Sequence, residues 1–370
     1  ARERFFGSAA VEPFWVADMD LPTPSFLVDR LRDRLAHPMF GYTEQYEAVF
    51  DAIVWWMNSQ HRAAVDPKWI LLSPSVVTSI SIAVQSLTEP GDSVIVLSPV
   101  YGPFFSCTKA NGRNVVDCPL RIEQGRFELD FTTLEKTMAH ANVKLLLLCN
   151  PHNPGGRVWS GSELAQLARL CAANNVILFS DEIHCDIVYP PHSHTSILNI
   201  AAAAGNCIVA HSIGKTFNTS GLQASFAIVP DAALRRRFRA GLERGHAGDV
   251  NLLGKVALAS ALSPEGADYK QQLVAYLHES IRQVCEKLQV LKNVDVMMPE
   301  ATFLVWCDFR TYGMWPEVFR RLIHKAGVAL SGGTFFGPAG EGWFRINCAH
   351  PRSQLLPALD RIIAEFQDQS

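Results

Sequence analysis

Residues 207–225 read CIVAHSIGKTFNTSGLQAS, an apolar run that ends in a polar turn carrying a single lysine, Lys215. The run does not alternate between apolar and polar residues, which indicates a strand covered on both faces. Three further short runs have the same character and also end at turn residues: SVIVL (93–97), KLLLLC (144–149) and VILFS (176–180). Strands of this kind are typical of a parallel sheet that lies between two layers of helices.

Helical patterns separate these apolar runs. Residues 160–175 place Ser160 three positions before Glu163, which is the spacing of a capping box, and gather leucines on one face. Residues 76–88 are also compatible with a helix and end in the turn signal EPGD. Strands that alternate with helices predict an α/β fold with a mostly parallel central sheet and helices on both faces.

The C-terminal third of the chain changes character. Apolar residues recur at steps of three and four across 271–292, which predicts one long helix. Shorter elements follow it: a strand at 302–309 and helices near 316–326 and 353–366. This pattern predicts a smaller α+β domain. We therefore expect two domains, a large one at 43–265 and a small one built from 1–42 and 266–370.

Composition restricts the function classes. Hydrophobic residues make up 48% of the 370 residues, which is ordinary for a soluble protein with a large core. Lys and Arg number 33 against 36 Asp and Glu, with no long block of either sign, so a nucleic acid or an anionic membrane is not expected as the main partner. No apolar run reaches membrane-spanning length. Nine cysteines without a repeated spacing predict reduced thiols in a cytoplasmic protein.

Four polar residues follow the C-terminal ends of the predicted strands: Tyr101, Asn153, Asp181 and Lys215. Ligands of open α/β sheets bind beyond the carboxyl ends of the strands, so these side chains are expected to converge on one pocket. Each has a plain structural interpretation as well. An Asp after a strand is often a helix N-cap, and an Asn in NPHNPGG suits any tight turn.

Lys215 admits three interpretations. IGKT imitates the end of a phosphate-binding loop, but the first glycine of that motif would stand at Val209, whose backbone is less free to curl around phosphates. A lysine solvated on a loop is the second interpretation. The third is an amine that bonds covalently to a carbonyl, because burial or a neighbouring cation keeps an amine unprotonated and nucleophilic. A pyridoxal phosphate site also needs a carboxylate at the ring nitrogen, for which Asp181 is suited.

A cluster of potential metal ligands lies further along: His184, Cys185, Asp186, His192 and His194. His184 and Cys185 are adjacent, so their side chains are expected to point apart in an extended or helical segment. We therefore predict no metal site.

Several motifs, in this order and spacing, resemble the fold-type I pyridoxal-phosphate enzymes of the class I/II aminotransferase superfamily: NPHNPGGRVWS, SDEIHCDIVY, HSIGKTFNTSGLQAS and WFRINCAHPRSQL. Within it, further stretches are similar to the MalY/PatB branch, the cystathionine β-lyase-like C–S lyases: WVADMDLPTP (15–24), FGYT (40–43), SPVYGPFF (98–105), DEIHCD and KTFNTSGLQAS. The matches run from residue 15 to about residue 355. The resemblance implies the fold of the pyridoxal-phosphate-dependent transferases, with 43–265 as the cofactor-binding domain.

The resemblance also implies roles for individual residues. Lys215 would hold the cofactor covalently and then move the proton at the substrate Cα. Asp181 would pair with the pyridine nitrogen, Asn153 would donate to the ring 3-oxygen, and Tyr101 would stack on the ring. His184 stands three residues after Asp181, where many aminotransferases have a tyrosine that meets the cofactor.

The remaining implied roles concern the phosphate and the substrate. Phosphate would be bound by Ser212 and by the helix start at Ser75, Val76 and Val77, because helix N-termini bind anions. Arg345 would grip the substrate α-carboxylate as a two-pronged donor, near Asn153 and Tyr101. Tyr42 would reach the phosphate of a partner subunit, which implies a homodimer with shared active sites.

Besides His184, the sequence departs from the family pattern at three further positions. Aminotransferases commonly carry an arginine eight residues after the lysine, where this chain has Gln223, as the β-lyase branch does. Ser75 stands where the branch has glycine, and Gly214 where it more often has serine. Both are small, so we expect the phosphate to fit, with a cofactor affinity that could differ.

The resemblance favours β-elimination from a sulfur amino acid, L-cystathionine or a related cysteine S-conjugate, to give a thiol such as homocysteine, pyruvate and ammonia. An aminotransferase acting on an amino acid is the first alternative, because both reactions use every residue named above. A moonlighting protein that modulates transcription through protein contacts is the second, with no sequence feature in its favour.

Overall fold

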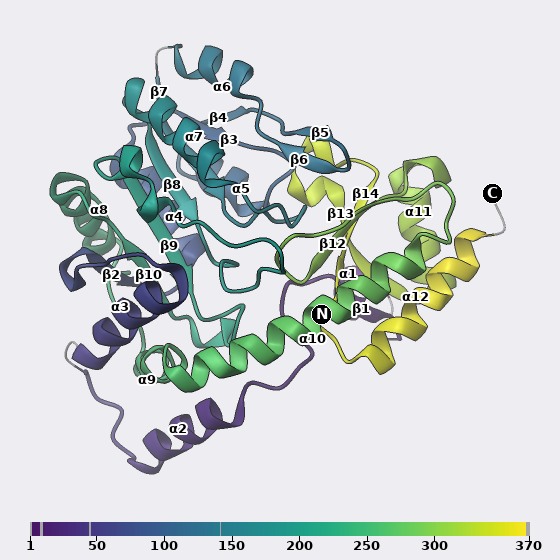
Figure 1. Ribbon diagram of the computed structural model, residues 1–370, viewed down its shortest axis with the longest axis horizontal. Helices are drawn as coiled ribbons and strands as arrows, with labels where there is room; N and C mark the ends of the chain where they lie inside the picture. Colours follow the sequence, from purple (N-terminus) through teal and green to yellow (C-terminus); the bar gives the residue numbers. More distant parts are fainter. Residues whose placement is uncertain (1, 8–9, 44–45, 141, 368–370) are drawn as a thin grey trace.

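The computed structural model describes residues 2–7, 10–43, 46–140 and 142–367, and its largest element is a seven-stranded sheet (Figure 1). The strand order is β2–β10–β9–β8–β7–β3–β4. Five neighbours, from β9 to β4, run parallel, and β10 is antiparallel to both β2 and β9. The bounds are β2 Ile70–Ser73, β3 Ser93–Val96, β4 Asn114–Asp117, β7 Val143–Cys149, β8 Ile177–Asp181, β9 Cys207–Ser212 and β10 Ser225–Ile228.

The strands of this sheet are buried on both faces. In β7, Leu145 and Leu147 pack into a cluster with α4 and α8, whereas Leu146 and Leu148 pack into a cluster with α6 and α7. Both layers exclude water, because all four leucines are fully buried. The two-sided apolar runs of the sequence therefore predicted this architecture correctly, and the α/β fold with a mostly parallel central sheet is confirmed. The flanking helices are α3 Glu47–His61, α4 Val76–Leu87, α5 Pro103–Ala110, α6 Phe131–Met138, α7 Gly161–Ala173, α8 Ala232–Arg244 and α9 Leu252–Ala261.

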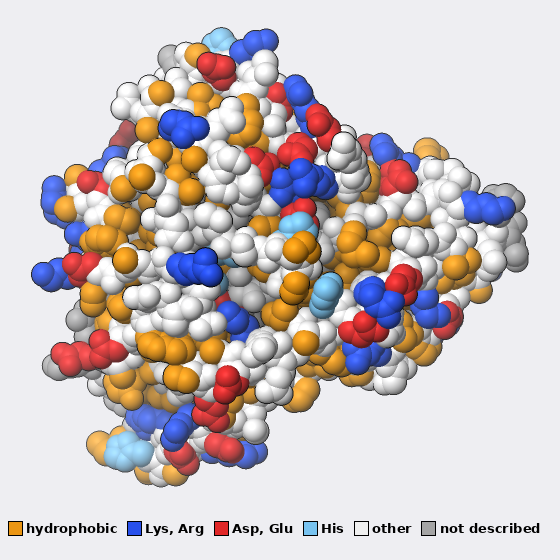
Figure 2. Space-filling view, in the orientation of Figure 1, with side chains coloured by type: hydrophobic (Ala, Val, Ile, Leu, Met, Phe, Trp, Pro, Cys, Tyr) orange, Lys and Arg blue, Asp and Glu red, His pale blue; other side chains and the backbone are white. Residues whose placement is uncertain are grey.

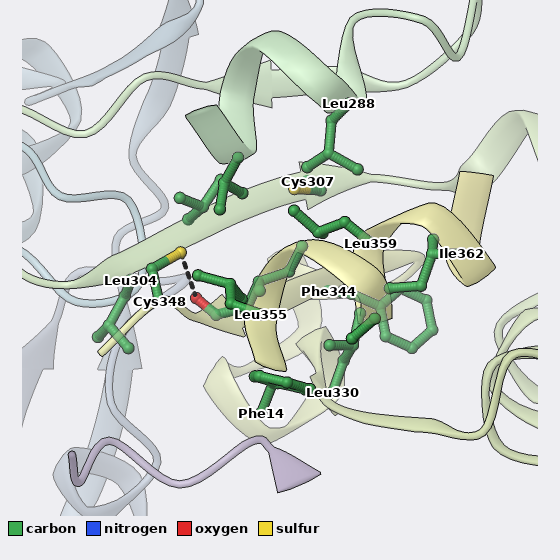
Figure 3. Packing of buried hydrophobic residues seen from close by; sticks show 14 of the residues in the cluster. Phe14, Leu288, Leu304, Cys307, Leu330, Phe344, Cys348, Leu355, Leu359 and Ile362 are labelled. Atoms are coloured by element: carbon green, nitrogen blue, oxygen red, sulfur yellow. Dashed lines mark hydrogen bonds between the residues drawn. The ribbon is translucent and has the colours of Figure 1, made fainter. Parts of the chain in front are cut away.

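A second sheet of five strands lies beside the first, in the order β1–β13–β14–β12–β11. Helices α10 and α12 cover one of its faces, and Figure 3 shows Leu355, Leu359 and Ile362 of α12 packed against strand residues such as Leu304 and Phe344. The bounds are β1 Glu12–Phe14, β11 Asp295–Met297, β12 Leu304–Asp308, β13 Val328–Gly332, β14 Trp343–Asn347, α10 Pro264–Leu288, α11 Trp315–Arg321 and α12 Arg352–Gln367.

Helix α10 runs from the region of α9 to the five-stranded sheet (Figure 1). It begins seven residues before the predicted range, because Ser263 caps it by accepting a hydrogen bond from the Gly266 N–H (3.2 Å) and Pro264 occupies the first turn. It ends at Leu288, four residues early. The apolar period alone locates the packed part of a helix, whereas its ends depend on capping.

The remaining regular elements are short or peripheral: α1 Arg2–Phe6, α2 Ser25–Ala36, β5 Arg121–Glu123 and β6 Arg126–Glu128. On the face shown in Figure 2, Lys and Arg side chains are interspersed with Asp and Glu. Within the described ranges, no helix combines the length and the apolar character that crossing a bilayer requires.

Candidate active site

The carboxyl ends of β7, β8 and β9 meet at one edge of the large sheet. Cys149 pairs with Asp181 and Asp181 pairs with Ala210, so Asp181 lies level with the ends of both neighbouring strands. A cavity of about 500 Å³ opens at this edge. Ten of the residues predicted from the sequence line it: Ser75, Val76, Val77, Tyr101, Asn153, Asp181, His184, Ser212, Lys215 and Arg345.

Arg345 reaches this cavity from the second sheet because of the alternation along β14. Phe344 and Ile346 point into the core beneath α10 and α12, whereas Trp343 packs on the opposite side against the large sheet's cluster. Arg345 shares that opposite side. Its guanidinium donates to Asn153 Oδ1 (2.9 Å) and to the Trp15 carbonyl (2.7 Å), and its Nε is buried without a hydrogen-bond partner.

Lys215 lies in the turn after β9 and points into the cavity. Its Nζ donates to the carbonyl of Ala17 and lies 3.5 Å from Asp18 Oδ1, so its acidic neighbour is 197 residues away in sequence. Burial lowers the pKa of the Lys215 ammonium, and the Arg345 charge lowers it further, against the opposing effect of Asp18. Of the three interpretations of Lys215, this largely buried position beside a cation favours the reactive, neutral amine.

Asp181 ends β8 and is buried at the cavity wall. Its Oδ1 accepts a hydrogen bond from the Ile183 N–H (3.1 Å). Burial raises the pKa of this carboxyl to about 7, although His211 and Lys215 pull the pKa in the other direction. A buried carboxyl of this kind is stabilised as a carboxylate when a cationic group binds against it.

An anion-binding cradle lies at the start of α4. Ser75 is the N-cap, and its hydroxyl accepts from the Thr78 N–H (3.1 Å). The N–H groups of Val76 and Val77 belong to the first turn and have no partner within the helix. Ser212 lines the same cavity; its hydroxyl donates to the Ala224 carbonyl (2.7 Å) and accepts from the Gly214 N–H (3.0 Å). The unpaired N–H groups of the first turn of α4 suit a phosphate group.

Three further predicted residues line the cavity. Tyr101 is partly exposed, and burial followed by the Asp181 charge raises the pKa of its phenol. His184 is buried, and burial holds the pKa of its imidazole well below the usual value, with Lys215 adding to the effect. Its Nδ1 has no hydrogen-bond partner. Asn153 is turned toward the cavity and toward Arg345.

Tyr42 lies outside this cavity and is fully exposed. Sequence reasoning also missed part of the wall: Trp15, Val16 and Ala17 line the cavity, and Asn347 Nδ2 holds their segment by donating to the Val16 carbonyl (2.6 Å). The motif WVADMDLPTP, which covers them, was the available signal.

Comparison with known proteins places this geometry in a family. The family described as aminotransferase class I and II matches residues 18–362. The chain belongs to this family. Cystathionine β-lyase PatB of Bacillus subtilis is 39% identical to it over 97% of this chain and 93% of its own length.

Solved structures agree with the family. Cystalysin from Treponema denticola, described as containing pyridoxal 5'-phosphate, superimposes with a TM-score of 0.94 at 31% identity, over 98% of this chain and 93% of its own. A pyridoxal-phosphate-bound C–S lyase from Staphylococcus hominis gives a TM-score of 0.92 at 30% identity, over 99% and 93%. The fold of the pyridoxal-phosphate-dependent aminotransferases, expected from the sequence, is thereby confirmed.

Proposed function

We propose that this protein is a pyridoxal-phosphate-dependent C–S β-lyase, which cleaves L-cystathionine or a related cysteine S-conjugate to a thiol, pyruvate and ammonia. One observation carries the proposal: Lys215, Asp181 and Arg345 line the same cavity as the anion cradle at the start of α4. PatB is named a cystathionine β-lyase, and the Staphylococcus enzyme is described as a C–S lyase with bound pyridoxal phosphate. Cystalysin is described as containing pyridoxal 5'-phosphate. Gln223, at the cavity wall, stands where aminotransferases commonly have an arginine.

The residues present fit the cofactor. The cradle at Ser75, Val76, Val77 and Ser212 would hold the phosphate, and the Asp181 carboxyl would face the ring nitrogen. Lys215 would be the point of covalent attachment, with Asn153, Tyr101 and His184 around the ring. When bound, pyridoxal phosphate supplies an electron sink that stabilises negative charge at the substrate Cα.

The chain's own residues would then bind and deprotonate the substrate. Arg345 is buried, carries an unpaired Nε donor and is fixed by Asn153, so it is suited to hold the α-carboxylate in one orientation. Lys215 would remove the Cα proton as a neutral amine, a form that its lowered pKa makes more accessible near neutral pH. Loss of the thiolate from Cβ follows from the negative charge that this proton transfer leaves.

We also propose a homodimer with shared active sites. Met39, Phe40 and Tyr42 are exposed apolar or aromatic residues that lie close together in sequence after α2. Exposed aromatic side chains grouped in this way are typical of protein contacts. Tyr42 would extend to the phosphate cradle of the partner subunit. The expected compartment is the cytoplasm.

The decisive assay supplies L-cystathionine without any keto acid. We expect continuous release of pyruvate and free thiol in equal amounts, measured by a coupled dehydrogenase and a thiol reagent. Matched incubations with L-alanine, which lacks the leaving group, should give no pyruvate without an added keto acid. A single equivalent of pyridoxamine phosphate with no thiol would instead identify an aminotransferase.

Arg345→Lys should mainly weaken substrate binding. Lysine keeps the charge but loses the planar pair of donors, so we expect KM for the amino acid to rise about ten- to hundred-fold, since a charged hydrogen bond contributes about 1.5–3 kcal/mol. Steady-state kinetics measure this change. Arg282→Lys, at an exposed position on α10, is the control and should leave KM unchanged. A normal KM in Arg345→Lys would remove Arg345 from the substrate site.

A further inference from the structure

A buried cluster of four potential metal ligands, two of which are next in sequence to cavity-lining residues, is formed by His61, Cys185, Asp186 and His211. His61 ends α3, Cys185 and Asp186 follow β8, and His211 lies in β9. None of the four is more than 6% exposed. The sequence had argued against a metal because His184 and Cys185 point apart. They do: His184 lines the cavity, and Cys185 contributes to this cluster instead.

Most of the ligand atoms lie near the separations that a tetrahedral ion requires, whereas His61 Nε2 and Asp186 Oδ1 lie at a hydrogen-bond distance that an ion would have to lengthen. Zinc binds sulfur at about 2.3 Å and nitrogen or oxygen at about 2.0–2.1 Å, which places neighbouring ligands of a tetrahedron about 3.3–3.6 Å apart. Cys185 Sγ lies 3.5 Å from His61 Nε2 and 3.8 Å from His211 Nε2. Asp186 Oδ1 lies 2.9 Å from His61 Nε2, and Asp186 Oδ2 lies 3.5 Å from His211 Nε2. All four ligand atoms fall within 4.8 Å of one another.

We propose that His61, Cys185, Asp186 and His211 form a structural site for a divalent transition-metal ion, with zinc as the ion that this ligand set fits. One thiolate, two imidazoles and one carboxylate are borderline-soft ligands, which favour zinc over magnesium or calcium. A bound Zn²⁺ is electrically neutralised by the Cys185 thiolate and the Asp186 carboxylate, so the buried site carries no net charge.

The cluster also has the surroundings of a metal site. Trp56 Nε1 donates to Asp186 Oδ1 (3.0 Å) and Thr216 Oγ1 donates to Asp186 Oδ2 (2.8 Å), which orients the carboxylate. A crevice of about 740 Å³ between α3, α10 and the 185–199 segment reaches three of the ligands and offers a path for the ion. His194 lines this crevice with a buried Nδ1 that has no hydrogen-bond partner.

The position of the cluster suggests what the ion does. Asp186 lies five residues after Asp181, and His211 lies four residues before Lys215. Thr216, which hydrogen-bonds Asp186, is the neighbour of Lys215. An ion here ties α3 to the ends of β8 and β9 and holds the segments that carry Asp181 and Lys215. It contributes rigidity from outside the cavity lining and takes no part in the reaction.

The test measures the metal itself in the purified holoenzyme. After incubation with ZnCl₂ and removal of unbound ions, elemental analysis by mass spectrometry should find about one zinc ion per chain. X-ray absorption at the zinc edge should resolve one sulfur neighbour among nitrogen and oxygen neighbours. Substitution with Co²⁺ should give the intense visible absorption of a tetrahedral, thiolate-bound ion. Cys185→Ala should lose zinc, whereas Cys171→Ala, which removes another buried thiol on α7, should retain it.

Three results would overturn the site. The first is wild-type protein that retains no stoichiometric zinc or cobalt, because the four side chains then form only a hydrogen-bonded network. The second is zinc with oxygen and nitrogen neighbours alone. The third is equal zinc in Cys185→Ala and Cys171→Ala, which places the ion elsewhere. If Cys185→Ala fails to fold, the absorption spectrum of the wild-type protein decides the question without it.

Discussion

Replacing Lys215 by alanine is expected to lower the rate of C–S cleavage by about 10⁴-fold or more, because the change removes both the covalent attachment point and the base. The side chain is the amine that enters the cavity beside Arg345, and burial lowers its pKa. Lys215→Arg should be as inactive, since a guanidinium stays protonated. Pyruvate release from L-cystathionine measures the effect.

A second measurement separates this role from a general loss of structure. After reduction with borohydride, mass spectrometry of peptides from the wild type should find the cofactor on the peptide that contains Lys215. Lys109→Ala, on the surface of α5, is the control and should keep both the label and the activity. Substantial cleavage activity in Lys215→Ala, or a label on another lysine, would refute the assignment.

Replacing Asp181 by asparagine should reduce kcat by about 10²–10³-fold, the loss typical of removing one charge-stabilising group from an active site. Asparagine preserves the shape and the hydrogen bond from Ile183, but it cannot hold a proton on the ring nitrogen. The electron sink that the cofactor provides is weakened as a result. Steady-state kinetics with saturating cofactor measure the change, and an unaltered kcat would exclude the role.

The same variant makes a prediction about stability in the cofactor-free protein. Burial raises the pKa of Asp181 from its ordinary value of 3.8 to about 7. Between these values the unfolded chain releases the proton and the folded chain keeps it, so the carboxyl costs stability progressively as pH rises toward 7. Asp181→Asn lacks this cost. The free energy of unfolding of Asp181→Asn, relative to that of the wild type, should therefore rise between pH 3.8 and about 7 and level off above it. Denaturant titrations at several pH values measure this difference.

Much of the fold followed from local sequence. The apolar runs at 93–97, 144–149, 176–180 and 207–212 became β3, β7, β8 and β9, because residues buried on both sides leave a pattern that needs no tertiary information. Strands β2, β4 and β10 of the large sheet were not predicted. Each is four residues long, and so short a run does not by itself reveal which strand it pairs with or in which direction. The domain limits near 43 and 265 stay a prediction.

The part of the candidate site that lies at the ends of the parallel strands was predictable from the sequence. Asp181, Ser212 and Lys215 lie where parallel strands finish, and parallel strands finish at one edge. Arg345 came only from the family motif, because its approach depends on how the second sheet docks against the first. The wall formed by Trp15, Val16 and Ala17 has the same origin: the Ala17 carbonyl meets Lys215 from a position 198 residues away in sequence.

The sequence by itself determined the class of fold, the set of reactive side chains and the family, since burial patterns and motif order are properties of the chain. Only the tertiary structure decided which distant groups became neighbours. It set Asp18 beside Lys215, and it turned Cys185 away from His184 to meet His61 and His211. The physical reason is that packing two sheets and a helix fixes distances between residues that are far apart in sequence, and no local pattern records those distances.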